Sequence, residues 1–261
     1  MAIRTLSHVA PVEMDVRQIE YPDSDGGPIG ETGFHVTQIL TTLVTLRLRY
    51  HDQDDVYVGA NMFLYYRRGD PKAVVAPDVF VVLSTSPDER RSYKVWEENG
   101  RVPSIVFEIT SSSTRDTDLL FKRALYEDLK VQEYVLFDPV GQYLEPVLQG
   151  YRLVQGRYVA VLPQSLPDGG YELASDVLGV TLRAESGVLA LYDRETGEKL
   201  LTPPELYERV GQESAARQAA EARVQQEAIA RQEAETRAEQ AEAELDQLRA
   251  ELARLRGKDA A

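Results

Sequence analysis

The sequence contains no cysteine, which excludes disulfide bonds and metal sites built on thiolates. Its apolar runs are too short to cross a bilayer, and the first thirty residues lack the continuous apolar segment of a signal peptide. We therefore expect a soluble, cytoplasmic protein with no membrane partner. Of the 261 residues, 43% are hydrophobic, which is enough to bury one good core.

Positive charge is also scarce. The chain has 29 Lys and Arg against 43 Asp and Glu, for a formal net charge of −14. From Pro203 onward there are only 13 acids against 9 bases, so most of the excess lies in the first 202 residues. Non-specific binding to nucleic acid comes mostly from Lys and Arg that displace counterions. A DNA substrate would therefore have to meet a local basic groove or bound metal ions.

Composition divides the chain into four segments. Residues 1–30 are weakly patterned and end in YPDSDGGPIG, which is typical of a loop. Residues 31–202 carry the strand and helix patterns of a folded domain. Residues 203–257 predict one long helix that forms a coiled coil, and residues 258–261 predict a disordered end.

A helix is expected from Glu31 to about Arg49. Its predicted buried stripe consists of Val36, Ile39, Leu40, Leu43 and Val44. Glu31, His35, Gln38 and Thr42 fall on a separate strip beside it. That strip either faces a cleft, with a carboxylate and an imidazole one turn apart, or is the solvated edge of an amphipathic helix.

The rest of the domain alternates strands with one helix. Strands are predicted over residues 56–68, 73–83, 104–110 and 131–137, with short hairpin strands of the same sheet between 142 and 192. A helix is predicted over 115–129, with Leu119, Leu120, Ala124 and Leu125 facing inward. The loop 84–103 holds Arg90, Arg91, Lys94 and Trp96, which either stack on a nucleobase or form a solvated surface loop with a packed tryptophan. This order predicts an α/β or α+β domain with a mixed sheet.

Acidic residues mark two of the predicted strands. Asp78 opens the apolar run PDVFVVL, and Glu108 lies inside the apolar run SIVFEIT, with Lys122 on the helix that follows. Two carboxylates and the carbonyl of Ile109 would give Mg²⁺ half of its oxygen shell. The plainer alternatives are a Pro-Asp turn and a Glu paired with a buried Arg. Because uncompensated buried carboxylates cost several kcal/mol, we expect Lys122 or a metal ion between them.

The motifs APDVFVV and VFEITSSSTRDTDLLFKRALYEDLKVQEYVLFDP, with ETGFH before and LQGYRL after, closely resemble the Uma-two family of endonucleases. This resemblance covers about Glu31 to Thr202. It implies a restriction endonuclease-like fold, with a mixed β-sheet core flanked by helices, and the motif PD followed by (D/E)xK. It also implies Mg²⁺ or Mn²⁺ as cofactor and DNA as substrate.

By this resemblance, Asp78, Glu108 and Lys122 are the catalytic residues. Glu31, Asp78, Glu108 and Ile109 are the metal ligands. The sequence departs from the motif at Thr110, which stands where the motif has lysine, and Lys122 on the following helix would take that role. The alternative function is an inactive restriction-like fold that serves as a binding or scaffold protein through its tail.

The C-terminal segment has a coiled-coil pattern. Leu245, Leu248, Leu252 and Leu255 are spaced 3, 4 and 3 apart, which is an a/d seam. RQAAEAR at Arg217 and RQEAETR at Arg231 recur two heptads apart. A continuous helix of this length, on the order of 75 Å, cannot bury such a seam alone. We therefore expect a homo-oligomer.

Overall fold

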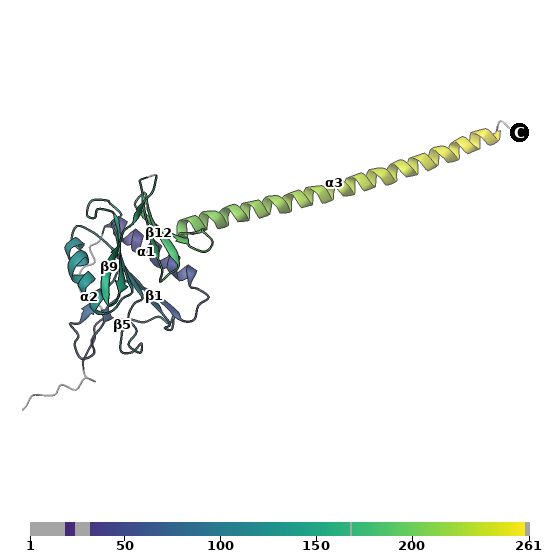
Figure 1. Cartoon of the computed structure of the whole chain (residues 1–261). Coiled ribbons are helices and arrows are strands. Elements are labelled where there is room, and N and C mark those ends of the chain that lie inside the picture. Colours follow the sequence, from purple (N-terminus) through teal and green to yellow (C-terminus); the bar gives the residue numbers. More distant parts are fainter. Residues whose placement is uncertain (1–18, 24–31, 168, 259–261) are drawn as a thin grey trace, which may run out of the picture. The chain divides into compact units, whose positions relative to one another are not determined.

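The structure, a computed structural model, describes residues 19–23, 32–167 and 169–258. Most of the predicted extension 1–30 and the end 259–261 thus lie outside the described residues. The chain divides into two units between Pro203 and Pro204. The first holds three sheets and the shorter helices, and the second is the helix α3 (Pro203–Lys258) (Figure 1). No helix in the described ranges has both the length and the apolar character that a membrane span needs.

The central sheet has six strands in the order β1, β4, β6, β7, β8 and β9. Their bounds are β1 Val56–Ala60, β4 Val79–Leu83, β6 Ile105–Ile109, β7 Glu133–Phe137, β8 Leu148–Val154 and β9 Arg157–Val161. β6 and β7 run parallel, and the other neighbours are antiparallel. The predicted mixed sheet is confirmed.

Two predicted strands are each divided. Residues 56–68 form β1 and then β2 (Leu64–Tyr65), because Asn61 turns the chain with φ +45°. Residues 73–83 form β3 (Val74–Val75) and β4. β2 pairs with β3 and also, in parallel, with β5 (Tyr93–Lys94), which lies inside the predicted loop 84–103.

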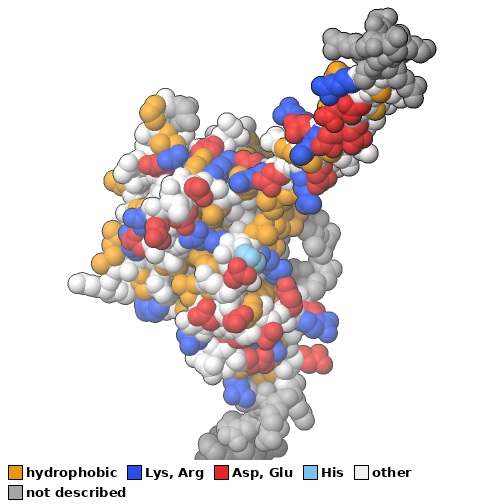
Figure 2. Space-filling model, turned by 90° about the vertical axis from the view of Figure 1, so that its right-hand side faces the viewer, with side chains coloured by type: hydrophobic (Ala, Val, Ile, Leu, Met, Phe, Trp, Pro, Cys, Tyr) orange, Lys and Arg blue, Asp and Glu red, His pale blue; other side chains and the backbone are white. Residues whose placement is uncertain are grey.

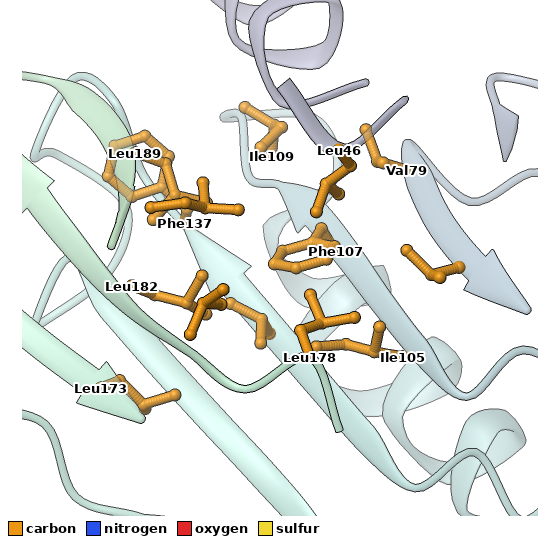
Figure 3. Packing of buried hydrophobic residues seen from close by; sticks show 14 of the residues in the cluster. Leu46, Val79, Ile105, Phe107, Ile109, Phe137, Leu173, Leu178, Leu182 and Leu189 are labelled. Carbon is orange, nitrogen blue, oxygen red and sulfur yellow. The ribbon is translucent and has the colours of Figure 1, made fainter. Parts of the chain in front are cut away.

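The prediction that the strands between 142 and 192 join the same sheet holds for β8 and β9 but is wrong for the strands after β9, which form a second sheet. This sheet has the order β10 to β14. Its strands are β10 Gln164–Ser165, β11 Tyr171–Ser175, β12 Val180–Glu185, β13 Val188–Asp193 and β14 Lys199–Leu200. Leucines of this sheet pack against Phe107 and Phe137 of the central sheet (Figure 3).

The two faces of the central sheet have different partners. Ile105, Phe107 and Ile109 of β6 pack towards α1 (Gly33–Arg49) and the second sheet. Val106 points to the opposite face, where it packs with Tyr126 of α2 (Arg123–Asp128). Since successive side chains of a strand alternate between the faces, Glu108 lies on the α2 face with Val106.

The buried face of α1 differs from the predicted stripe. Val36 and Leu40 are exposed, whereas His35, Gln38 and Thr42 of the polar strip are buried. The backbone N–H of Leu189 on β13 donates to Gln38 Oε1 (3.2 Å), so a polar side chain is satisfied within the core. The solvated-edge interpretation of this strip is therefore wrong for the described residues of the strip.

Candidate active site

Asp78 and Glu108 lie beside each other at one end of the central sheet. Val79 of β4 faces Phe107 of β6, and one step further along the same antiparallel register Asp78 faces Glu108. Both side chains share a sheet face, because each is one residue from this facing pair. The backbone N–H of Ile109 donates to Asp78 Oδ2 (2.7 Å). The predicted pairing of acids on neighbouring strands is thus confirmed.

Lys122 lies against this pair. Its Nζ is 2.7 Å from Glu108 Oε2 and 3.0 Å from Asp118 Oδ1. The hydroxyl of Tyr126 donates to the other Glu108 oxygen, Oε1 (2.8 Å). The Glu108 side chain is fully buried, and that of Lys122 is 14% exposed. Lys122, one of the two expected cations, thus lies beside the buried carboxylate.

The helix that delivers Lys122 begins with a widened turn. Thr117–Lys122 form a π-helical segment, η2, that continues directly into α2. Leu120 and Ala124 are exposed, so their prediction as inward residues is wrong. Asp118, Lys122 and Tyr126 point inward instead, at a constant spacing of four residues. In the sequence, an acid lies four residues before Lys122 and a tyrosine four residues after it. This spacing is the signal that could have identified Asp118 and Tyr126.

The first turn of α1 reaches the same place. His35 Nε2 is 3.5 Å from Asp78 Oδ2, and the His35 side chain is buried. The side chain of Thr32 caps the helix by accepting from the His35 backbone N–H (3.4 Å). The predicted ligand Glu31 lies just outside the described residues. The described part of α1 therefore contributes an imidazole to the surroundings of Asp78.

The site carries more carboxyl groups than bases. Burial raises the pKa of Glu108 to about 8, although Lys122 opposes the shift. Burial likewise raises the pKa of Asp118. Burial alone would lower the pKa of Lys122, but Glu108 and Asp118 outweigh it and hold that pKa above its ordinary value. Ionised carboxylates are thus costly here, and an additional cation would stabilise them.

Thr110 occupies the position of the motif lysine. It is 1% exposed and shares the sheet face of Glu108, two residues along. Its Oγ1 is buried and has no hydrogen-bond partner among the described residues. An unsatisfied buried hydroxyl is unusual in a protein core.

The basic loop before β6 does not form a stacking surface. Arg90 lies over the ring of Tyr57 (4.1 Å to the centroid) and pairs with Glu98 (2.9 Å). The ring of Trp96 packs against Tyr21, with centroids 4.9 Å apart. These contacts favour the packed-tryptophan interpretation. On the face shown in Figure 2, basic and acidic side chains are interspersed rather than gathered in one basic tract.

Comparison with known families decides the classification. The sequence model of Uma2, described as "Putative restriction endonuclease", matches residues 15–185. The chain belongs to the Uma2 family. This confirms the resemblance found in the sequence. A comparison with curated proteins gives no match.

Solved structures are also similar to this Uma2 protein. One of them is described as "a putative nuclease belonging to DUF820 from Anabaena variabilis ATCC 29413". The two chains are 16% identical, and the match covers 53% of this chain and 74% of the other with a TM-score of 0.38.

The donor set of this Uma2 protein suits a hard divalent cation. Asp78 and Glu108 offer carboxylate oxygens, and Mg²⁺ prefers such ligands. Within the described ranges, no three His, Cys, Asp or Glu side chains converge as a ready metal cluster. A metal ion would thus rely on the two carboxylates and the carbonyl of Ile109. Lys122 would have to release Glu108 Oε2, which it now contacts, for that oxygen to bind the ion.

Proposed function

We propose that the protein is a metal-dependent endonuclease that hydrolyses phosphodiester bonds of DNA with Mg²⁺ or Mn²⁺. The observation that carries this proposal is the fully buried Glu108, held by Lys122 at 2.7 Å directly beside Asp78. Carboxylates whose pKa is shifted by burial beside a specific charge partner cluster at functional sites. Membership of the Uma2 family supports the same reaction class.

The residues divide into ligands and supporting groups. Asp78, Glu108 and the Ile109 carbonyl would hold the cation, and Glu31 would complete the set from the start of its helix. When bound, the metal supplies Lewis acidity and lowers the pKa of a water molecule. Lys122, once released from Glu108, holds a proton at Nζ that can be offered to a phosphate oxygen. The Tyr126 hydroxyl keeps Glu108 Oε1 in place.

The direct test is a cleavage assay on supercoiled plasmid, linear duplex and single-stranded DNA with Mn²⁺, Mg²⁺ or EDTA. We expect metal-dependent nicking by the wild type and loss of it in Asp78→Ala and Glu108→Ala. Asp116→Asn is the matched control, because Asp116 is an exposed acid near the same helix. Cleavage by both Ala variants at the wild-type rate would refute the proposal, as would no cleavage of any substrate.

An inactive binding or scaffold protein is the second candidate. The Glu108–Lys122 pair is complete without a metal, and Thr110 replaces the motif lysine. Calorimetric titration with Mn²⁺ distinguishes the two functions. Binding that is lost in Glu108→Ala supports the endonuclease. A wild type with no measurable affinity for Mn²⁺ supports the scaffold.

We also propose that α3 mediates self-association. Every described side chain from Leu206 to Ala250 is exposed, although several are large and apolar. Truncation after Thr202 should leave a folded domain. The molecular mass per particle should fall by more than the mass removed from each chain, because the particle then contains fewer chains. Light scattering of the full chain and the truncated chain measures this. A full-length chain that is already monomeric would contradict the proposal.

A further inference from the structure

The exposed apolar residues of α3 follow the heptad seam. Extending the a/d pattern back from Leu245 and Leu248 gives a positions every seven residues from Val210 and d positions every seven from Leu206. Leu206, Val210, Val224, Leu245 and Leu248 are all at least 37% exposed and occupy this seam. Tyr207 and Ile229, also exposed, lie outside it. The seam is therefore an uncovered stripe along one side of the helix.

Four charged residues interrupt the seam. Arg217 and Arg231 occupy a positions, and Glu213 and Glu227 occupy d positions. In a parallel pair each residue faces its own copy in the partner. Arg would then face Arg in two layers and Glu would face Glu in two more, and like charges across an interface are strongly unfavourable.

An antiparallel pair changes these layers, because a positions then face d positions of the partner. In the register centred on residue 222, Arg217 faces the partner's Glu227 and Arg231 faces the partner's Glu213. The same register sets a large apolar residue against alanine in three layers. These layers join Val224 to the partner's Ala220, Val210 to the partner's Ala234, and Leu206 to the partner's Ala238.

Neighbouring antiparallel registers lose this match. A shift by one heptad in either direction sets all four charged residues opposite Ala, Val or Leu. The longer overlap centred on residue 229 pairs Arg231 with the partner's Glu227 but sets Glu213 opposite the partner's Leu245. Buried charges without partners are costly, so charge complementarity favours the register centred on residue 222 over these three.

We propose that α3 pairs with α3 of a second copy in antiparallel orientation, centred on residue 222. The proposal rests on the self-association proposed above and assigns its geometry. Within each helix the seam charges have only exposed partners, such as Arg217 Nε to Glu221 at 2.9 Å, and exposed pairs of this kind hold side chains weakly. Residue 203 would face residue 241, so the two helix starts lie about 57 Å apart and residues 242–258 of each helix, with Leu245 and Leu248, extend beyond the paired segment.

Distance measurement between two spin labels tests the orientation in the full chain. The protein has no cysteine, so Glu208→Cys provides one unique, exposed label on the outer side of the helix. We expect a separation of about 42 Å, because residue 208 faces residue 236. A separation below about 20 Å would establish a parallel pair, and one near 63 Å the longer overlap. Either result overturns the proposed geometry. A monomer by light scattering overturns self-association itself.

Charge exchange provides an independent test. Glu213→Arg with Glu227→Arg would set Arg against Arg in the antiparallel pair, and we expect the dimer dissociation constant to rise by about tenfold or more. Adding Arg217→Glu and Arg231→Glu should restore it. Glu233→Arg with Glu239→Arg changes the net charge equally outside the seam and should have little effect. If the first pair of substitutions also has little effect, the antiparallel proposal is wrong.

Discussion

Glu108→Gln is expected to abolish metal-dependent cleavage without unfolding the protein. The glutamine keeps the shape of the side chain and an oxygen that accepts from Tyr126 or Lys122, and Lys122 retains Asp118 as a partner. It removes the negative charge that would hold the cation. Loss of an outer contact to a metal ligand costs roughly 10- to 100-fold in affinity or activity, so loss of the ligand itself should cost at least that much. Single-turnover cleavage and calorimetry with Mn²⁺ measure the two effects.

The same variant tests the buried carboxyl by pH. The pKa of Glu108 is about 8 in the folded protein against an ordinary 4.5. Between these values the folded state keeps a proton that the unfolded state has released, so this group's contribution to stability declines as pH rises from about 4.5 to 8. Glu108→Gln lacks this proton. As the pH rises through this range, its free energy of unfolding in EDTA should therefore increase relative to that of the wild type.

Urea unfolding of both proteins at several pH values provides the comparison. A constant difference between the two curves would show that Glu108 does not titrate in this range. A Glu108→Gln variant that is unfolded at every pH would show that the carboxylate is needed for the fold, and the loss of cleavage would then carry no information about metal binding.

The central strands and their acids were predictable because both signals are local. Apolar runs in the sequence give β4 and β6 directly, and a Glu inside such a run requires a compensating cation. The buried face of α1 was not predictable in this way. Apolar periodicity favours Val36 and Leu40 as inward residues, whereas Gln38 is satisfied by Leu189, 151 positions away. No pattern within a single helix contains that partner.

The surroundings of Lys122 illustrate the same limit. A helix of ordinary pitch with apolar residues inward places Leu120 against the core and sends Asp118 to solvent. In the structure Asp118 and Lys122 both point inward from the π-helical segment. Glu108, which is buried on the sheet, requires a compensating cation, and Lys122 supplies it. The need of Glu108 for a cation predicts that Lys122 points inward. It does not predict that Asp118, the acid one turn before Lys122, does so as well.

Lys122→Met is expected to have a large effect on stability as well as on cleavage. It leaves Glu108 buried without its cation, and breaking one side of a buried ion pair costs about 3–5 kcal/mol. The loss should be largest near pH 9, where Glu108 is ionised, and smaller at pH 6, where Glu108 can bind a proton. Mn²⁺ should recover more stability in Lys122→Met than in the wild type, because the metal replaces the missing positive charge. Thermal unfolding at pH 6 and pH 9, with Mn²⁺ or EDTA, measures the loss of stability and its recovery by the metal.

Thr110→Lys in the Lys122→Met background tests whether the lysine has moved from the strand to the helix. Position 110 lies on the same sheet face as Glu108, and its hydroxyl makes no hydrogen bond to any described residue. An ammonium introduced there should restore part of the stability and raise cleavage at least about tenfold over Lys122→Met, a part of the roughly 10²- to 10⁴-fold that general acid–base catalysis supplies. Thr110→Val, which only removes the unsatisfied hydroxyl, is the control and should cleave like the wild type. If Thr110→Lys restores stability but no cleavage, the two lysine positions are not equivalent, and the role of Lys122 depends on its own helix.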